Sequence, residues 1–152
     1  MSKIKSFRGK IASGNGSTSG LGVETINLHT NNGSVGYRIK KFEVMGSSLE
    51  SNNYEATVKI YTIPQTLPDH TIDFSDNTLL ASAFFDNNNS TAYVASSAII
   101  FDNITFNQDI YVTNRESNAL EMNYHIELEI IKLDLNENTV ATLKDIRNIK
   151  SQ

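Results

Sequence analysis

The sequence predicts an all-β protein, an antiparallel jelly-roll-like β-sandwich of about eight strands with a short C-terminal helix. Segments of alternating apolar and polar residues recur along the chain, separated by turn sequences rich in Asn, Asp and Gly. The most regular segment is residues 121–133, EMNYHIELEIIKL, in which Met122 to Ile130 place apolar side chains on every even position. Only the end of the chain has a helical period. Eight is also the number of strands in a jelly roll.

The first half of the chain contains four predicted strands. The third has a change of parity, because its apolar residues are odd from Val35 to Ile39 and even from Phe42 onward. Side chains alternate strictly along a strand, so one extra residue must be inserted, and we predict a β-bulge near Lys40 and Lys41. The strands are expected at residues 4–12, 23–30, 35–45 and 54–62.

The second half begins with a connection and then returns to strands. Pro64 and Pro68 confine residues 63–69 to an extended loop, since proline cannot donate to a ladder. Residues 86–90, DNNNS, predict a turn. Strands are expected at residues 71–74 and 78–85, as one interrupted strand or two short ones, and at residues 92–101, 108–113 and 121–133.

Two segments differ from the strands in kind. Residues 13–22, SGNGSTSGLG, contain four glycines and predict a flexible loop. Residues 136–150 predict a helix whose apolar stripe packs either on its own sandwich or on another protein. Its basic residues lie late, where they complement the helix dipole. The stripe consists of Val140, Leu143, Ile146 and Ile149.

Length and composition favour a single domain spanning residues 1–152. A chain of this size buries roughly 68–70% of its unfolded surface, so no disulfide or metal is needed for stability. The absence of cysteine excludes thiol catalysis and zinc–thiolate sites. No secretion signal or membrane-spanning run is recognisable, so we expect a soluble protein.

The charge of the chain is unevenly distributed. Residues 42–131 contain two basic and thirteen acidic residues (−11), and the flanks contain eleven basic and four acidic residues (+7), which gives the net charge of −4. This pattern is either an ordinary solvated surface or a sign that the terminal segments dock on an acidic surface, such as a neighbouring copy. An acidic body argues against nucleic acid as the main partner.

The usual sequence motifs of catalytic and nucleotide-binding sites are missing. The glycines form no phosphate-binding loop, and no G-x-S-x-G sequence occurs, although two carboxylates would suffice for glycoside hydrolysis. The acidic segment 69–76 around His70 could hold a divalent cation, but EF-hand spacing is absent. We therefore expect no catalytic residue, no cofactor and no metal. Tyr61, Tyr93 and Tyr111 remain as platforms on which a sugar could stack.

Two stretches in the second half of the chain are distinctive, IIFDNITFNQDIYVTNRESNALEMN and MNYHIELEIIKLDLNENTVATLKDIRNIKSQ, in which a long strand precedes a short ATLKDIRN helix. In these stretches the chain resembles small virion proteins of tailed bacteriophages from marine bacteria with AT-rich genomes. This resemblance implies a β-sandwich that sits on a capsid surface or vertex as a decoration or accessory protein, often in several copies. The expected partners are the major capsid protein or other virion proteins and copies of the chain, with no nucleic acid and no membrane.

On this hypothesis the terminal segments make the contacts. The expected interface residues are Lys3, Lys5, Arg8 and Lys10 near the N-terminus and Leu143, Ile146 and Arg147 in the helix. The alternative is a carbohydrate-binding or receptor-binding sandwich whose site is formed by loops 64–76 and 86–91. A hydrolase using Asp73 and Asp76 is a third possibility.

Overall fold

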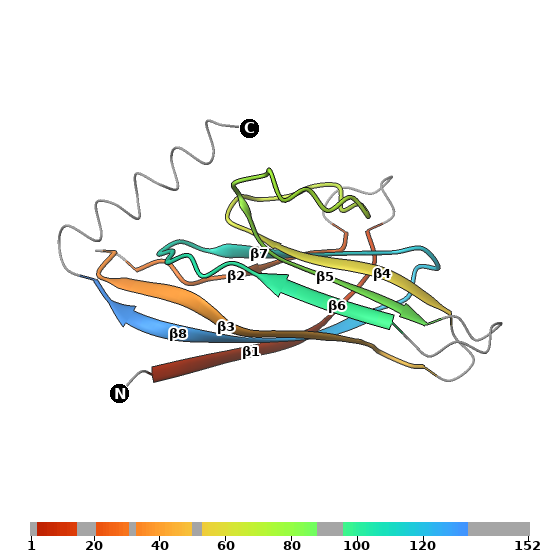
Figure 1. Cartoon of the computed structure of the whole chain (residues 1–152), viewed down its shortest axis with the longest axis horizontal. Coiled ribbons are helices and arrows are strands. Elements are labelled where there is room, and N and C mark those ends of the chain that lie inside the picture. The colour runs from red at the N-terminus through yellow and green to blue at the C-terminus, as the bar shows by residue number, and fades with distance from the viewer. Residues whose placement is uncertain (1–2, 15–20, 31–32, 50–52, 88–95, 134–152) are drawn as a thin grey trace.

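The chain forms two facing antiparallel sheets, as the computed structural model of the protein shows (Figure 1). The structure describes residues 3–14, 21–30, 33–49, 53–87 and 96–133. The predicted all-β class is therefore confirmed, whereas the predicted helix at 136–150 lies outside the described residues. The strands are β1 (Lys3–Ile11), β2 (Val23–Ile26), β3 (Val35–Gly46), β4 (Tyr54–Tyr61), β5 (Leu79–Asn87), β6 (Ser96–Phe101), β7 (Ile110–Glu116) and β8 (Met122–Lys132).

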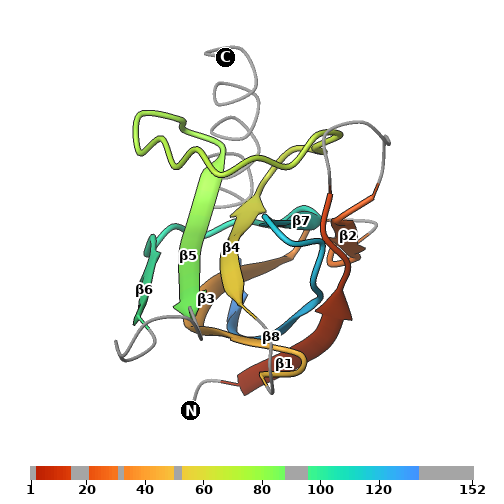
Figure 2. The ribbon, with the colours of Figure 1, turned by 90° about the vertical axis from the view of Figure 1, so that its right-hand side faces the viewer.

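The two sheets have different sizes. The smaller has the strand order β1-β8-β3, and the larger has the order β2-β7-β4-β5-β6. Figure 2 shows the sheets from the end, with β6 at one margin of the larger sheet and β2 at the other. Apolar side chains from the inner faces of both sheets meet in one core.

Strand β8 is the centre of the smaller sheet. It pairs with β1 from Lys3↔Ile130 to Ile11↔Met122 and with β3 on its other side. Its side chains Met122, Tyr124, Ile126 and Leu128 are buried, and the intervening ones are half-buried on the outer face. The alternation predicted for residues 121–133 is confirmed.

The predicted bulge in the third strand is also confirmed. The register of β3 against β8 shifts between Ile39 and Lys41. As a result Ile39 and Phe42 are both buried, although they differ in parity. The extra residue at Lys40 allows one strand to keep its apolar residues on the core side throughout.

Strands β4 and β7 form the centre of the larger sheet. The predicted inward residues Tyr54, Ala56, Val58 and Ile60 of β4 are all buried, as are Ile110 and Val112 of β7. Tyr54 contacts Phe85 of β5 edge to face, with 5.6 Å between ring centroids. Its hydroxyl donates to Ser48 O and accepts from Ser48 N, each at 2.9 Å. The polar end of this buried ring is therefore satisfied.

The expected strand at residues 71–74 is wrong. This segment belongs to the connection between β4 and β5, which runs over the outer face of the larger sheet. Asp73 Oδ1 accepts from Ser75 N at 2.9 Å, and Asp76 Oδ1 accepts from Thr78 N at 2.9 Å. These local side-chain bonds compete with a ladder and favour turns.

The Gly-rich segment is closed at its base by β7. Gly14 N donates to Asn114 O at 2.9 Å, and Asn114 N donates to Gly22 O at 2.8 Å. Gly22 has φ +76°, and a Cβ there would lie 2.2 Å from Gly14 N, so this position requires glycine. Residues 15–20, the middle of the predicted flexible loop, lie outside the described residues.

Asp109 makes the stability of this end of the sandwich depend on pH. Its Oδ1 accepts from Leu28 N at 2.7 Å, from His29 N at 3.0 Å and from the His29 ring, with Nδ1 at 2.7 Å. Burial raises the pKa of Asp109, but these hydrogen bonds and the charge of His29 outweigh burial and lower the pKa below its ordinary value of 3.8.

A lowered carboxyl pKa stabilises the fold above the unfolded-state pKa, and this contribution is lost as the pH falls through the folded-state pKa. We expect the free energy of unfolding to decline below about pH 4, and Asp109→Asn to reduce that decline. Urea unfolding of both proteins at pH values from about 2.5 to about 7, in steps of about half a pH unit, measures the free energy of unfolding as a function of pH. Equal acid slopes in the two proteins would contradict the prediction.

Candidate interaction surface

The N-terminal half of the expected interface lies on one exposed edge strand. Lys3, Lys5, Arg8 and Lys10 all belong to β1 and are exposed. Register places Arg8 and Lys10 on the outer face of the smaller sheet, opposite His125 and Asn123. Lys3 and Lys5 point to the other side of the strand. The expected contacts at Leu143, Ile146 and Arg147 lie outside the described residues.

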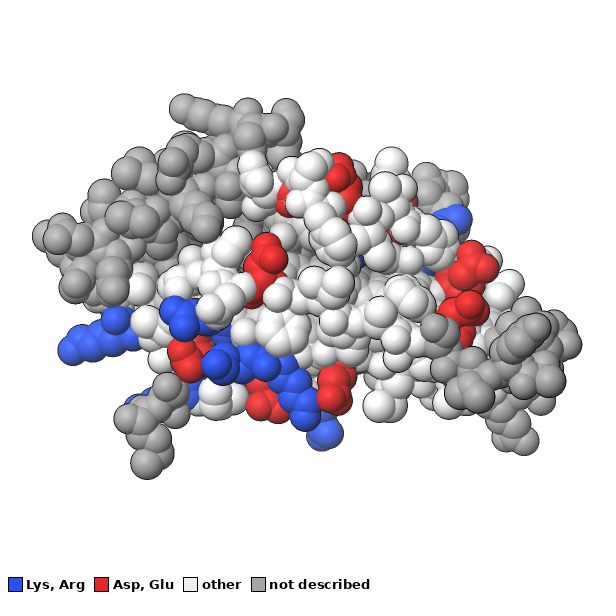
Figure 3. All heavy atoms as spheres, in the orientation of Figure 1, with Lys and Arg blue, Asp and Glu red and all other residues white. Residues whose placement is uncertain are grey.

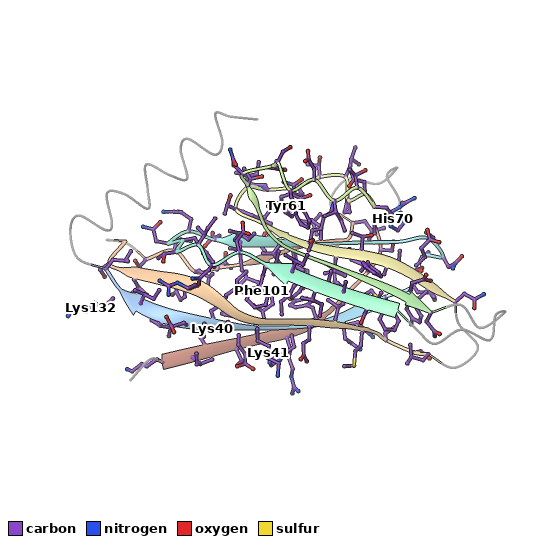
Figure 4. All side chains as sticks on the ribbon, viewed as in Figure 1. Lys40, Lys41, Tyr61, His70, Phe101 and Lys132 are labelled. Atoms are coloured by element: carbon purple, nitrogen blue, oxygen red, sulfur yellow. The ribbon has the colours of Figure 1, made fainter. Side chains whose placement is uncertain are left out.

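Cations of β1 share the outer face with a second group from β3, which the sequence analysis did not assign to the site. Figure 3 shows basic side chains in a band over this sheet with acidic side chains among them. Lys40 and Lys41 lie at the bulge and point away from the sandwich (Figure 4). We call this surface the charged face. It comprises Arg8, Lys10, Arg38, Lys40, Lys41, Glu43, His125, Glu127 and Glu129.

The acidic residues of β8 are matched by the cations of β3. Glu129 lies 3.7 Å from Arg38 Nη1 and 3.8 Å from Lys40 Nζ, and Glu127 lies 3.9 Å from Lys41 Nζ. These pairs are long and partly exposed, so each contributes at most about 1 kcal/mol. Part of the positive charge of the flanks is therefore paired with negative charge of the middle segment within the chain itself.

A shallow groove of about 690 Å³ crosses the charged face. His125 lies in it, with Arg8 on one neighbouring strand and Lys41 and Glu43 on the other. Arg8 makes no ion pair with any described residue. The groove also exposes Met45, which has 57% of its surface accessible. Among the described residues that line it, no nucleophile lies against a base and no three possible metal ligands converge.

The alternative function would use the connection between β4 and β5. The polar groups of this connection are bound to other residues of the protein. Lys59 of β4 is only 3% exposed beneath it. Lys59 Nζ donates to Asp69 Oδ1 at 2.7 Å and to Thr71 O at 2.6 Å. The acidic cluster therefore neutralises a buried ammonium. The signal in the sequence for this contact is that Lys59 is one of only two basic residues within the acidic segment 42–131.

His70 holds the same connection to the sheet (Figure 4). Its Nδ1 lies 3.0 Å from Thr57 Oγ1, and its Nε2 lies 3.0 Å from Ser117 Oγ. Ser117 Oγ donates its single proton to Glu55 Oε1 at 3.0 Å, so it accepts from His70 Nε2–H. The imidazole then has no hydroxyl proton to remove from Ser117, and the pair lacks the geometry of a nucleophile with its base.

The other groups considered for binding are also placed by the structure. Tyr61, expected as an exposed platform, is buried at 9% exposure because the β4–β5 connection covers its strand. Its ring lies 5.5 Å from Lys59 Nζ. Tyr111 is half-buried, and Tyr93 lies outside the described residues. Among the described residues, no three His, Asp or Glu side chains are close enough to hold a metal ion.

No protein-family model matches the chain, and no curated protein matches its sequence. Within the part of the chain that the structure describes, no helix is long and apolar enough to span a membrane.

Proposed function

We propose that the sandwich is a jelly roll in which one strand has changed sheets. A jelly roll arises when a long antiparallel ribbon, with strand pairs 1-8, 2-7, 3-6 and 4-5, is wound into two sheets. Here β1 pairs with β8, β2 with β7, and β4 with β5. The fourth pair is reduced to a bridge in which Tyr37 of β3 exchanges hydrogen bonds of 2.7 Å and 2.9 Å with Phe106, just after β6. Strand β6 pairs with β5 instead.

From this strand order we infer a non-enzymatic virion structural protein, a capsid decoration or accessory protein that binds the shell or its own copies. Jelly rolls build viral capsid proteins and lectins, and ribbon order is the observation that carries the proposal. The resemblance to phage virion proteins points the same way. The described residues offer no converging nucleophile, base or metal ligands, which supports a structural role over a hydrolase that uses Asp73 and Asp76.

The alternative function, a carbohydrate-binding or receptor-binding sandwich, is less well supported by the same geometry. Its proposed site would include residues 64–76, but Asp69 is bound to Lys59 and His70 to Thr57 and Ser117. Binding a sugar there would break these bonds, at a cost comparable to the hydrogen bonds gained. The second proposed loop, 86–91, lies mostly outside the described residues. A glycan-binding screen separates the two functions, since a shell protein shows no saturable affinity for sugars.

Strand β1 is the proposed attachment element among the described residues. It presents basic side chains on both faces at the edge of a sheet, which favours an acidic partner such as a capsid surface. We expect Lys3→Gln with Lys5→Gln to weaken binding to particles about 10-fold, because two exposed cations are lost. Lys40→Gln with Lys41→Gln removes the same charge from the opposite edge strand, where both cations are already paired with Glu129 and Glu127 of the same chain, and serves as the control.

Cosedimentation with particles that lack the protein measures this difference, and both double variants should unfold close to the parent midpoint. Equal loss in both pairs would mean that only net charge matters and that β1 is not the attachment element.

Mass spectrometry of purified particles tests the function itself. Peptides of this chain should be found and counted against the major capsid protein. Copies in the hundreds would indicate a decoration protein, and on the order of a dozen would indicate a vertex, neck or tail position, as closed symmetry requires. Absence from particles would overturn the virion proposal.

A further inference from the structure

Strand β6 is an edge strand of the larger sheet, and on one side its backbone groups are paired with no described residue. It pairs with β5 on one side, from Ala81↔Phe101 to Asp86↔Ser96, and no described residue pairs with its other side. Asp102 N donates to Leu80 O at 2.8 Å, so the even-numbered residues direct their backbone groups toward β5. Because direction alternates along a strand, Ser97, Ile99 and Phe101 direct N–H and C=O away from the sheet.

The other three sheet edges carry protection against strand addition. Strand β1 places four Lys and Arg residues along its edge, and β2 has only four residues. Strand β3 has the bulge at Lys40 and is partly bridged to Phe106. Charges, shortness and bulges are the usual means of blocking edge pairing. Strand β6, SSAIIF, has no charge, no proline and no bulge against β5.

We propose that β6 pairs antiparallel with β6 of a second copy of the chain, about a two-fold axis at Ile99. Hydrogen-bonded pairs can form only between odd residues of both copies, and the axis at Ile99 is the one that pairs all three of the outward-directed residues. Ile99 then pairs with its own counterpart, and Ser97 pairs with Phe101 of the partner in both directions. Each of these pairs exchanges two backbone hydrogen bonds. The two larger sheets become one continuous sheet.

A second copy fits this edge because the edge is complementary to itself. Two-fold pairing of β1 would oppose Lys and Arg with Lys and Arg, whereas pairing of β6 opposes no charges. Apolar side chains that are otherwise in water flank the edge: Ile100 is 54% and Phe101 37% exposed, and the exposed Phe84 lies opposite Ala98 and diagonal to Ile100 on the outer face. In the proposed register Ile100 packs against Ala98 of the partner and toward the partner's Ile100. Figure 4 labels Phe101, at the end of β6.

Proline at an outward-directed position separates edge pairing from folding. Ser97→Pro removes an N–H that points away from β5, so the ladder inside the protein is kept and only pairing to the second copy is lost. We expect the dimer dissociation constant to rise at least about 30-fold, because two intermolecular hydrogen bonds vanish and the ring obstructs the partner strand. Ser97→Ala keeps the N–H and should dimerise like the parent protein. Sedimentation velocity over a concentration series measures both.

Cysteine pairs test the register, since the chain has no cysteine of its own. Ala98 and Ile100 of opposite copies form a non-hydrogen-bonded pair with Cα atoms about 4.5 Å apart, which a disulfide can bridge. Identical residues are diagonal neighbours about 7–8 Å apart, which is too far. Mild oxidation of an equimolar mixture of Ala98→Cys and Ile100→Cys proteins should therefore give a covalent dimer, and neither protein alone should do so.

Two results would overturn the proposal. One is a parent protein that stays monomeric at all concentrations, and the other is cross-linking in the single-variant samples to the same extent as in the mixture. Both side chains are exposed, so the cysteine variants should fold, and a matching circular dichroism spectrum checks this. The inference does not depend on the virion role, because the dimer is measured in solution with purified protein.

Discussion

Replacing Leu128 by alanine is expected to lower the free energy of unfolding by about 3–4 kcal/mol. Leu128 has no exposed surface and lies on β8, the central strand of the smaller sheet, with Ile39 opposite it on β3. Truncation removes the buried methyl groups and leaves a cavity that a sheet held on both sides cannot close. Urea or guanidinium unfolding followed by circular dichroism gives the value, with the slope checked for two-state behaviour.

Glu127→Ala is the matched control for this experiment. Glu127 is the preceding residue, but it points outward and makes only partly exposed contacts with Lys41 at 3.9 Å and His125 at 3.2 Å. Its loss should change the free energy of unfolding by less than about 1 kcal/mol. Similar effects of the two substitutions would mean that the outer face is also covered, as assembly on a partner would require.

The fold class could be predicted because strand periodicity is a local property. Each side-chain direction in β8 and β4 follows from the position of the residue in its own segment, so the sequence alone indicates which residues enter the core. The bulge at Lys40 was predictable for the same reason, since a change of parity within one strand has no other regular solution. Neither inference needs the identity of the neighbouring strand.

Features that depend on distant partners could not be predicted. Residues 71–74 alternate between polar and apolar residues, as in a strand. However, Asp69 and Thr71 accept hydrogen bonds from the buried Lys59, and Asp73 accepts from Ser75 in its own turn. The pairing of β6 with β5 in place of β3 depends on whole-sheet geometry that no single segment encodes. Local propensity is regularly overridden by such tertiary contacts.

The candidate site was predictable only in its composition. The basic character of β1 is visible in the sequence, but the charged face is completed by residues of β8 and β3, which lie far from β1 in the sequence, a separation that periodicity cannot bridge. The free edge of β6 is likewise an outcome of sheet order. An uncharged strand is unremarkable in the middle of a sheet and becomes an interaction site only at its edge.

Glu116→Ala is expected to have the largest effect of any single substitution discussed, a loss of about 3–5 kcal/mol. Glu116 ends β7, and its side chain is only 2% exposed. Its Oε2 accepts from Glu55 N at 2.8 Å, and its Oε1 accepts from Asn118 N at 2.6 Å and Leu120 N at 2.9 Å. Three backbone donors therefore depend on one carboxylate, and alanine leaves all of them without it.

Glu116→Gln provides the graded comparison. The amide oxygen can still serve Asn118 and Leu120, but the NH₂ group then faces Glu55 N–H, donor against donor, so we expect a smaller loss of about 1–2 kcal/mol. Glu121→Ala, which removes an exposed carboxylate 3.8 Å from Lys10, should cost less than about 1 kcal/mol. Chemical unfolding of the three variants should rank them in this order. If Glu116→Ala is no worse than Glu121→Ala, water replaces the carboxylate, and the turn from β7 to β8 is held by the Ser13 contacts at Glu116 N and O instead.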